Sequence, residues 1–112
     1  MKHDFKNSKR HSFGLAFTDG IIQIRVLESV QEYIEEGLAL RHCVFTNEYH
    51  LKEKSLILSA SIAGKPIETI ELSLETMEIL QCRGLMNQNA EYPERIIELV
   101  HRNIKEIQSR VA

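Results

Sequence analysis

The segment from Leu56 to Leu74 constrains the fold more than any other part of the chain, because its side chains alternate between apolar and polar. The apolar positions of its first half are Leu56, Leu58, Ala60 and Ile62, and those of its second half are Ile70, Leu72 and Leu74. Successive side chains of a strand point to opposite faces, so each half predicts a strand with one buried face. Gly64 and Lys65 between the halves predict a tight turn, and therefore an antiparallel pair.

A further hairpin is predicted upstream, and another strand downstream. Asp19-Gly20 separates two apolar runs, residues 13–17 and 21–27, and Asp-Gly between such runs is a strong hairpin signal. Residues 77–83 form the third strand of a meander. If Leu80 and Cys82 face the core, Gln81 and Arg83 share the other face of that strand.

Two segments have helical periodicity. Ser29 and Glu32 form a capping box at the start of the first helix. Its apolar stripe is Val30, Tyr33, Ile34, Gly37 and Leu38, whereas Glu32, Glu35 and Glu36 take the outer face. We expect Gly37 to end or loosen this helix. Pro93 begins the last helix, whose stripe consists of Ile96, Leu99, Val100, Asn103, Ile104 and Ile107.

The order of these elements predicts an α+β fold. It consists of an antiparallel sheet of about five strands, a hairpin followed by a three-stranded meander. Two main helices pack on one face of this sheet, in the order ββαβββα. Residues 1–12 form a flexible basic tail, and residues 13–112 form a single domain.

Charge and targeting signals narrow the classes of function. The tail carries four basic residues against one acidic residue, a charge of +3, so the remaining residues carry −5 of the overall −2. A compact nucleic-acid-binding domain usually has a basic face, so this balance lowers the expectation of such binding. The N-terminus has no secretory signal, and no apolar run is long enough for a membrane helix. We expect a cytoplasmic protein with Cys43 and Cys82 reduced.

The main candidate site lies where the third meander strand ends. Gln81 and Arg83 are two residues apart, Gly84 permits a sharp change of backbone direction, and Asn87 follows. We expect His42 to lie close to this group. The cluster would then either bind a ligand carboxylate or phosphate through Arg83, or form an internal network that fixes a helix to the sheet.

Other chemistry at His42 and Cys43 is less well supported. Adjacent side chains on a helix point in different directions, so a direct pair between them is not favoured, and catalysis by Cys43 requires an activated thiolate. Zinc ligands could come from His42, Cys43, His50 and Cys82, but their spacing fits no structural zinc motif, and we expect no metal. Phosphate-binding glycine loops and dinucleotide fingerprints are absent, so no cofactor is expected.

Several short runs of the sequence belong together: residues 26–30, 35–37, 40–44 with Tyr49, 70–72, and 81–84 with Asn87. In combination these runs resemble the PcfJ-like proteins of conjugative plasmids, integrative elements and phages. The resemblance covers roughly residues 13–108. Family members often carry this block near the C-terminus of a longer chain. The family pattern often has a second His where this chain has Arg41, and a Lys where it has Leu85.

The resemblance implies a link to mobile DNA and no particular reaction. Our leading hypothesis is an accessory or interaction domain that acts through a protein partner of a conjugation or phage system, or through nucleic acid. The rival hypothesis is a hydrolase or nuclease-like enzyme with His42 as acid or base and Arg83 steadying an anion. A cleft joining these two groups would favour the enzyme, and a filled polar network would favour the accessory domain.

Overall fold

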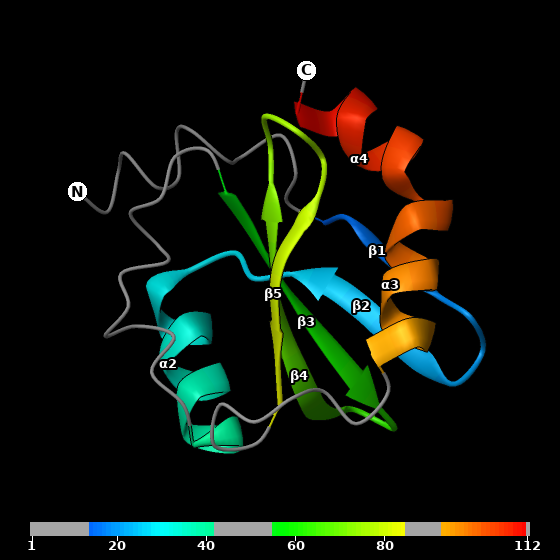
Figure 1. The fold of residues 1–112 in the computed structure, drawn as a ribbon. Coiled ribbons are helices and arrows are strands. Elements are labelled where there is room, and N and C mark those ends of the chain that lie inside the picture. The colour runs from blue at the N-terminus through cyan, green and yellow to red at the C-terminus, as the bar shows by residue number, and fades with distance from the viewer. Residues whose placement is uncertain (1–13, 42–54, 85–92, 112) are drawn as a thin grey trace.

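A five-stranded antiparallel sheet forms the centre of the computed structural model, which describes residues 14–41, 55–84 and 93–111 (Figure 1). The strands are β1 (Ala16–Thr18), β2 (Ile22–Val26), β3 (Ser55–Ile62), β4 (Lys65–Ser73) and β5 (Ile79–Arg83). The helices are α2 (Val30–Leu40), α3 (Pro93–Arg102) and α4 (Ile104–Val111). Each strand pairs antiparallel with the next along the chain. The predicted α+β class, with a hairpin followed by a meander, is confirmed.

Asp19 organises the turn between β1 and β2. Its Oδ1 accepts hydrogen bonds from the backbone N–H groups of Ile21 and Ile22, both at 2.9 Å. Its other carboxylate oxygen pairs with Nε of Arg95 in α3. The Arg95 guanidinium and the two N–H groups hold the pKa of Asp19 well below its usual range. Stabilisation from this carboxylate is therefore present above its unfolded pKa and is lost as the pH falls through the folded value.

The turn between β3 and β4 consists of two residues with positive φ. Ala63 has φ 52° and Gly64 has φ 80°, and Ile62 pairs directly with Lys65 across them. Two residues with positive φ match the right-handed twist of the flanking strands in a two-residue hairpin. The turn predicted at Gly64 is therefore present, one residue earlier than expected.

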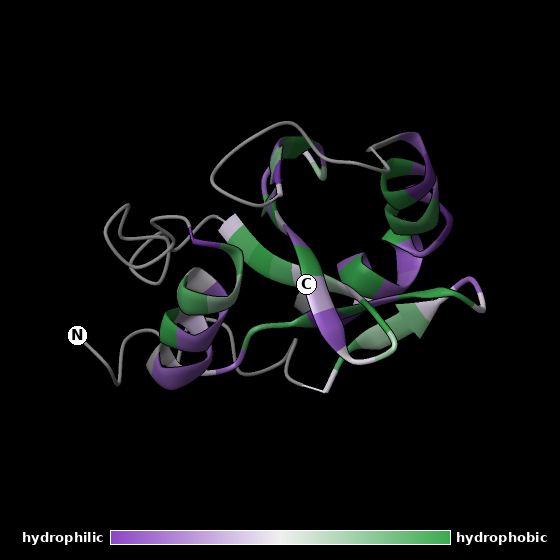
Figure 2. Ribbon diagram, turned by 90° about the horizontal axis from the view of Figure 1, so that it is seen from below, coloured by the Kyte–Doolittle hydropathy of each residue, from purple (hydrophilic) through white to green (hydrophobic). Residues whose placement is uncertain are grey.

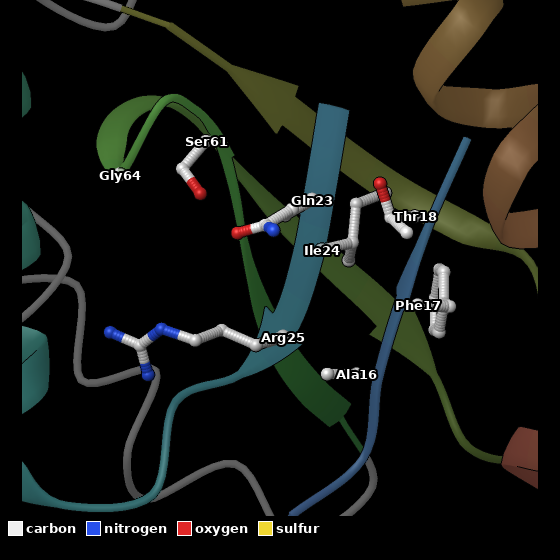
Figure 3. Close-up of a pocket in the computed structure, with 8 residues that line it drawn as sticks. All are labelled: Ala16, Phe17, Thr18, Gln23, Ile24, Arg25, Ser61 and Gly64. Atoms are coloured by element: carbon white, nitrogen blue, oxygen red, sulfur yellow. The ribbon is translucent and has the colours of Figure 1, made fainter. Parts of the chain in front are cut away.

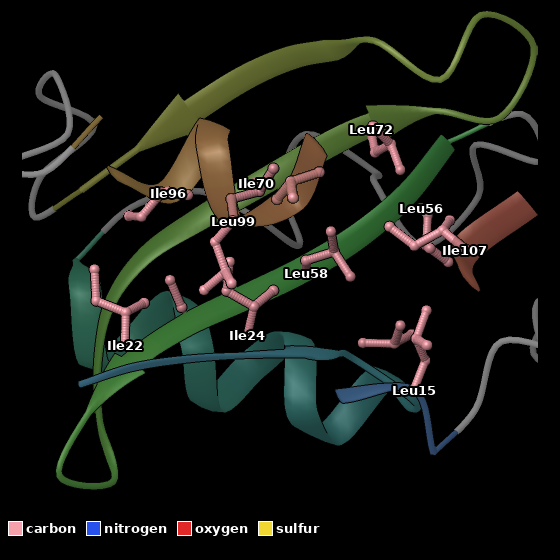
Figure 4. Close-up of a cluster of buried hydrophobic side chains, with 13 residues drawn as sticks. Leu15, Ile22, Ile24, Leu56, Leu58, Ile70, Leu72, Ile96, Leu99 and Ile107 are labelled. Atoms are coloured by element: carbon pink, nitrogen blue, oxygen red, sulfur yellow. The ribbon is translucent and has the colours of Figure 1, made fainter. Parts of the chain in front are cut away.

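One face of the sheet packs against α3 and α4 and forms the main apolar core (Figure 4). The buried side chains come from all parts of this layer: Leu15, Ile22, Ile24, Val26, Leu56, Leu58, Ala60, Ile70, Leu72, Ile96, Leu99, Val100 and Ile107. These include the faces predicted for β3 and β4. Burying one Leu or Ile side chain fully contributes about 1.5–3 kcal/mol to the stability of the folded state. The burial of this face is therefore the main contribution that favours folding.

The other face of the sheet packs against α2, and this corrects the prediction that both helices share one face (Figures 1 and 2). Leu58 belongs to the core under α3, whereas the neighbouring Ser59 hydrogen-bonds to Glu36 of α2. Neighbouring residues of a strand point to opposite faces, so the two helical layers lie on opposite sides. The prediction was wrong because polar side chains on a strand were read as facing water.

The buried stripe of α2 also differs from the predicted one. Tyr33, Glu36 and Leu40 are buried, whereas Ile34 and Leu38 are 38% and 76% exposed. The spacing of the buried three is still helical, at i, i+3 and i+7, but the inward face is rotated because Glu36 finds partners on the sheet. The helix does not end at Gly37. It continues to Leu40, and Arg41 closes it in the left-handed conformation with φ 53°.

The C-terminal helical segment is divided at Asn103. The side-chain amide of Asn103 donates to the carbonyl of Leu99 at 2.9 Å, and α4 begins at the next residue. Ion pairs at i,i+4 lie on the outer side of this segment, at 3.8 Å between Arg102 and Glu98 and at 3.7 Å between Arg110 and Glu106. None of the helices in the described ranges is long and apolar enough to cross a membrane.

Ser29→Ala should lower the free energy of unfolding by about 1 kcal/mol, because it removes an N-cap acceptor. Ser29 Oγ accepts from the backbone N–H of Glu32 at 3.1 Å, as the capping box predicts. Chemical denaturation followed by circular dichroism measures the change. Ser109→Ala is the control, since that hydroxyl only donates to a carbonyl on the exposed surface of α4. An unchanged midpoint for Ser29→Ala would show that this cap does not stabilise the helix.

Candidate functional site

Buried polar side chains lie between α2 and the sheet. We call this group the polar layer, and its members are Glu36, Ser55, Ser59, Thr69, Glu71 and Gln81. Gln81 is half-buried and the other five are buried. Glu36 and Glu71 are only 3% exposed. A buried carboxylate requires hydrogen-bond donors, so the contacts of these two residues decide what the layer does.

Glu36 connects α2 to two strands. Its Oε1 accepts from the hydroxyl of Ser59 and its Oε2 from the hydroxyl of Thr69, both at 2.7 Å. Ser59 and Thr69 are directly opposite each other in the β3–β4 register. The two hydroxyls therefore hold one carboxylate from neighbouring strands, and this fixes where α2 lies on the sheet.

Glu71 connects three strands in the same way. It accepts from the hydroxyl of Ser55 on β3 at 2.7 Å and from the side-chain amide of Gln81 on β5 at 3.1 Å. Glu71 and Gln81 are register partners on β4 and β5. This second carboxylate therefore ties an edge strand to the centre of the sheet.

Burial changes the protonation of the groups in and beside this layer. It raises the pKa of Glu36, although the hydrogen bonds from Thr69 and Ser59 act in the opposite direction. Burial and the nearby Glu71 also raise the pKa of Tyr33, so this phenol stays neutral at physiological pH. The region thus favours neutral or hydrogen-bonded forms.

A β-bulge places Gln81 in the polar layer. Glu71 pairs with Gln81 and the next residue, Leu72, pairs with Ile79, so Leu80 is an extra residue in β5. Without the bulge, Ile79 and Gln81 would share a face. With it, Ile79 packs against the main core while Gln81 faces α2. Of the two residues considered for the core side of this strand, Leu80 is instead 54% exposed.

The other predicted site residues are only partly within the described ranges. Arg83 is exposed at the end of β5 and pairs with Thr69, on the same face as Gln81, and Gly84 is buried. His42, Cys43, His50 and Asn87 lie outside the described residues, as does the predicted approach of His42 to Gln81. What the structure establishes is that α2, which ends just before His42, lies on the same side of the sheet as Gln81.

Cys82 lies on the opposite face from Gln81, as predicted. It is a free thiol that pairs with Ile70 across the sheet and donates to Oε2 of buried Glu68 at 3.0 Å. Burial, and then Glu68, raise the pKa of this thiol, which disfavours the nucleophilic thiolate. Within the described part of the chain, no three acidic, His or Cys side chains gather where they could hold a metal ion.

Sequence reasoning missed the two carboxylates that organise the polar layer. Glu36 was assigned to the outer face of the helix, and Glu71 alternates with the apolar residues Ile70 and Leu72, so it was not expected in the core. One signal could have found them. Ser59, Thr69 and Glu71 repeat at alternate positions of two adjoining strands, and a helix precedes those strands with a carboxylate in phase with Tyr33 and Leu40.

The fold and the polar layer define a small antiparallel α+β domain in which hydrogen-bonded carboxylates fasten a helix to one face of the sheet. The family model of PcfJ-like proteins matches residues 1–97, so this chain belongs to the PcfJ-like protein family. The resemblance seen in the sequence is thereby confirmed. No curated protein and no solved structure matches the chain.

Glu36→Gln should change the pH dependence of stability. Because the folded pKa of Glu36 is raised, its contribution to stability is full below the unfolded pKa of about 4.3 and is lost as the pH rises through the folded value. An amide keeps the shape and cannot ionise. The unfolding free energy of the variant, relative to wild type, should therefore rise as the pH increases from about 4 through the folded pKa of Glu36.

Denaturant titrations across this range measure that difference. Glu35→Gln is the matched control, since it removes one negative charge from the exposed side of α2. A difference between Glu36→Gln and wild type that stays constant with pH, or falls as the pH rises, would contradict the assignment.

Gln81→Ala should lower the free energy of unfolding by about 1–2 kcal/mol, because it removes an amide donor from the buried carboxylate of Glu71. Leu80→Ala is a control at the neighbouring residue, whose exposed side chain should contribute much less. Thermal or chemical denaturation measures both. Equal losses for the two variants would mean that the bond from Gln81 to Glu71 contributes nothing specific.

Proposed function

We propose that this chain is an accessory or interaction domain of a mobile-genetic-element protein, related to conjugation or phage systems and acting in the cytoplasm through a partner protein. One observation carries the proposal. The buried carboxylates of the polar layer accept hydrogen bonds from this chain's own hydroxyl and amide groups. Membership of the PcfJ-like family supports the association with mobile elements.

The polar layer has the properties of a structural network. A general acid or base must reach a substrate proton within hydrogen-bond distance. Both oxygens of Glu36 are instead bound by strand hydroxyls at 2.7 Å, and the carboxylate is 3% exposed. Cys82 is held as a protonated thiol on the other face. The contacts of these groups therefore favour a domain that functions by binding a partner at its surface.

The charge of the chain favours protein as the partner over nucleic acid. Residues 13–112 carry a net charge of −5, whereas binding to a phosphate backbone depends on clustered Lys and Arg. The rival function, a hydrolase or nuclease using His42 and Arg83, has one supporting observation: Arg83 is exposed at the end of β5.

The proposal is tested by screening the full chain, in a two-hybrid assay, against the other proteins encoded by the same mobile element. Each hit is then measured with purified proteins by calorimetry. We expect a saturable complex with a protein of that element. Gel-shift assays with single- and double-stranded DNA at several salt concentrations, and nuclease and phosphatase assays, run beside it.

Variants on two different elements test whether a complex uses a particular surface of the domain. Leu38→Glu on α2 and Leu80→Glu on β5 each change an exposed apolar side chain, and a genuine interface should be sensitive to one of them and not to the other. His42→Ala and Arg83→Ala address the rival function. Substrate turnover that both of these variants abolish, or binding to DNA without any protein partner, would overturn the proposal.

A further inference from the structure

A pocket of about 360 Å³ lies on the sheet at its β1 side (Figure 3). The described residues that line it are Ala16, Phe17, Thr18, Gln23, Ile24, Arg25, Ser61 and Gly64. This volume is at the small end of the range for ligand pockets, about 300–1,000 Å³. None of the residues that line it belongs to the polar layer or to the cluster around Gln81 and Arg83, although Arg25 is the register partner of Ser59 in the polar layer.

Three polar side chains besides Thr18, whose hydroxyl donates to the carbonyl of Ile22, enter this pocket from one face of the sheet. Gln23 and Ser61 are register partners, and Arg25 is paired with Ser59, which faces α2. By strand alternation, Gln23, Arg25 and Ser61 therefore all lie on the α2 side. Figure 3 shows them extending to the same side, whereas Phe17 and Ile24 extend to the other.

The same face of the sheet carries two kinds of polar surface. Near β4, the hydroxyls of Ser59 and Thr69 are bound to Glu36. Near β1, by contrast, the structure shows no side-chain hydrogen bond for Gln23 or Ser61 in the described part of the chain. The pocket therefore has an amide and a hydroxyl that remain able to donate to a ligand.

Arg25 is held in place beside these two donors. Its Nη1 donates to Oε1 of Glu32 at 2.9 Å, and the same oxygen accepts the backbone N–H of Glu28 at 2.9 Å. The carboxylate that holds Arg25 is thus itself anchored at the start of α2. The Arg25 side chain is 52% exposed. A guanidinium has five N–H donors, so the contact with Glu32 leaves several of them for a ligand.

We propose that this pocket binds an oxyanion group, a carboxylate or a phosphate, with Arg25 supplying the guanidinium and Gln23 and Ser61 supplying neutral donors. Guanidinium groups match the geometry of both oxyanions through paired hydrogen bonds. Glu32 offsets the charge of Arg25, so long-range attraction is weak and recognition depends on direct hydrogen bonds. Simple anions should therefore bind in the millimolar range. The inference does not depend on the proposed partner protein.

The test is a titration of the isotopically labelled full chain, followed by nuclear magnetic resonance. Sodium acetate and sodium phosphate are the probes, and sodium chloride at matched ionic strength is the reference. We expect saturable shifts at Gln23, Arg25 and Ser61, including the Arg25 side-chain N–H. Shifts with acetate alone would indicate a carboxylate ligand, and shifts with phosphate alone would indicate a phosphate ligand. Shifts with both probes would indicate a site for oxyanions in general.

Two variants and one control complete the experiment. Arg25→Gln should abolish saturation, and Gln23→Leu, which leaves the ion pair between Arg25 and Glu32 intact, should weaken it severalfold. Arg102→Gln is the control, because Arg102 is also an exposed arginine paired with a glutamate, on α3. The proposal is overturned if neither acetate nor phosphate produces saturable shifts. It is also overturned if Arg25→Gln and Arg102→Gln weaken anion binding equally, or if the Gln23→Leu variant is folded and binds the anions as tightly as wild type.

Discussion

The position of α2 on the sheet depends on one buried carboxylate. Glu36 accepts from hydroxyls on two neighbouring strands, and almost none of it contacts solvent. Removing a carboxylate from water costs several kcal/mol, and only well-placed donors offset this cost. A helix shifted by one turn would move this carboxyl group away from Ser59 and Thr69. The hydrogen bonds of Glu36 therefore favour one position of α2 on the sheet over other positions that apolar contacts alone would leave close in energy.

The two faces of the sheet are consequently built on different principles. Under α3 and α4 the contacts are aliphatic, and many small changes of side-chain packing cost little. Under α2 there are buried apolar side chains too, such as Ile57 and Leu40, but the contacts of Glu36 and Glu71 are directional, because each carboxylate accepts from particular hydroxyl or amide groups. β3 and β4 are covered on both faces, so the aliphatic face supplies most of the stability while the polar layer supplies the alignment. The bulge at Leu80 extends this alignment to β5, because it turns Gln81 toward Glu71.

The sequence predicts the elements of this fold better than their arrangement. Alternation over residues 56–74, the Asp-Gly turn and the Ser29 cap depend on local chemistry, and all three are present. The side of the sheet taken by α2 was not predictable in this way. Ser59 and Thr69 look the same in sequence whether they meet water or a buried Glu36. Among the candidate site residues, Gln81 and Arg83 lie on the expected face. Nothing local indicates the bulge between them and Ile79, because it arises from pairing with β4.

The family match ends at residue 97, inside α3, whereas the aliphatic face continues to depend on side chains beyond that point. Leu99, Val100 and Ile107 are all buried against the sheet. The segment that the family model matches is thus shorter than the segment that supplies the buried aliphatic cluster. A protein cut at the family boundary would present the aliphatic surface of β2, β3 and β4 to water, and such a surface promotes aggregation. For this chain, the family match ends before the side chains that complete the aliphatic face of the sheet.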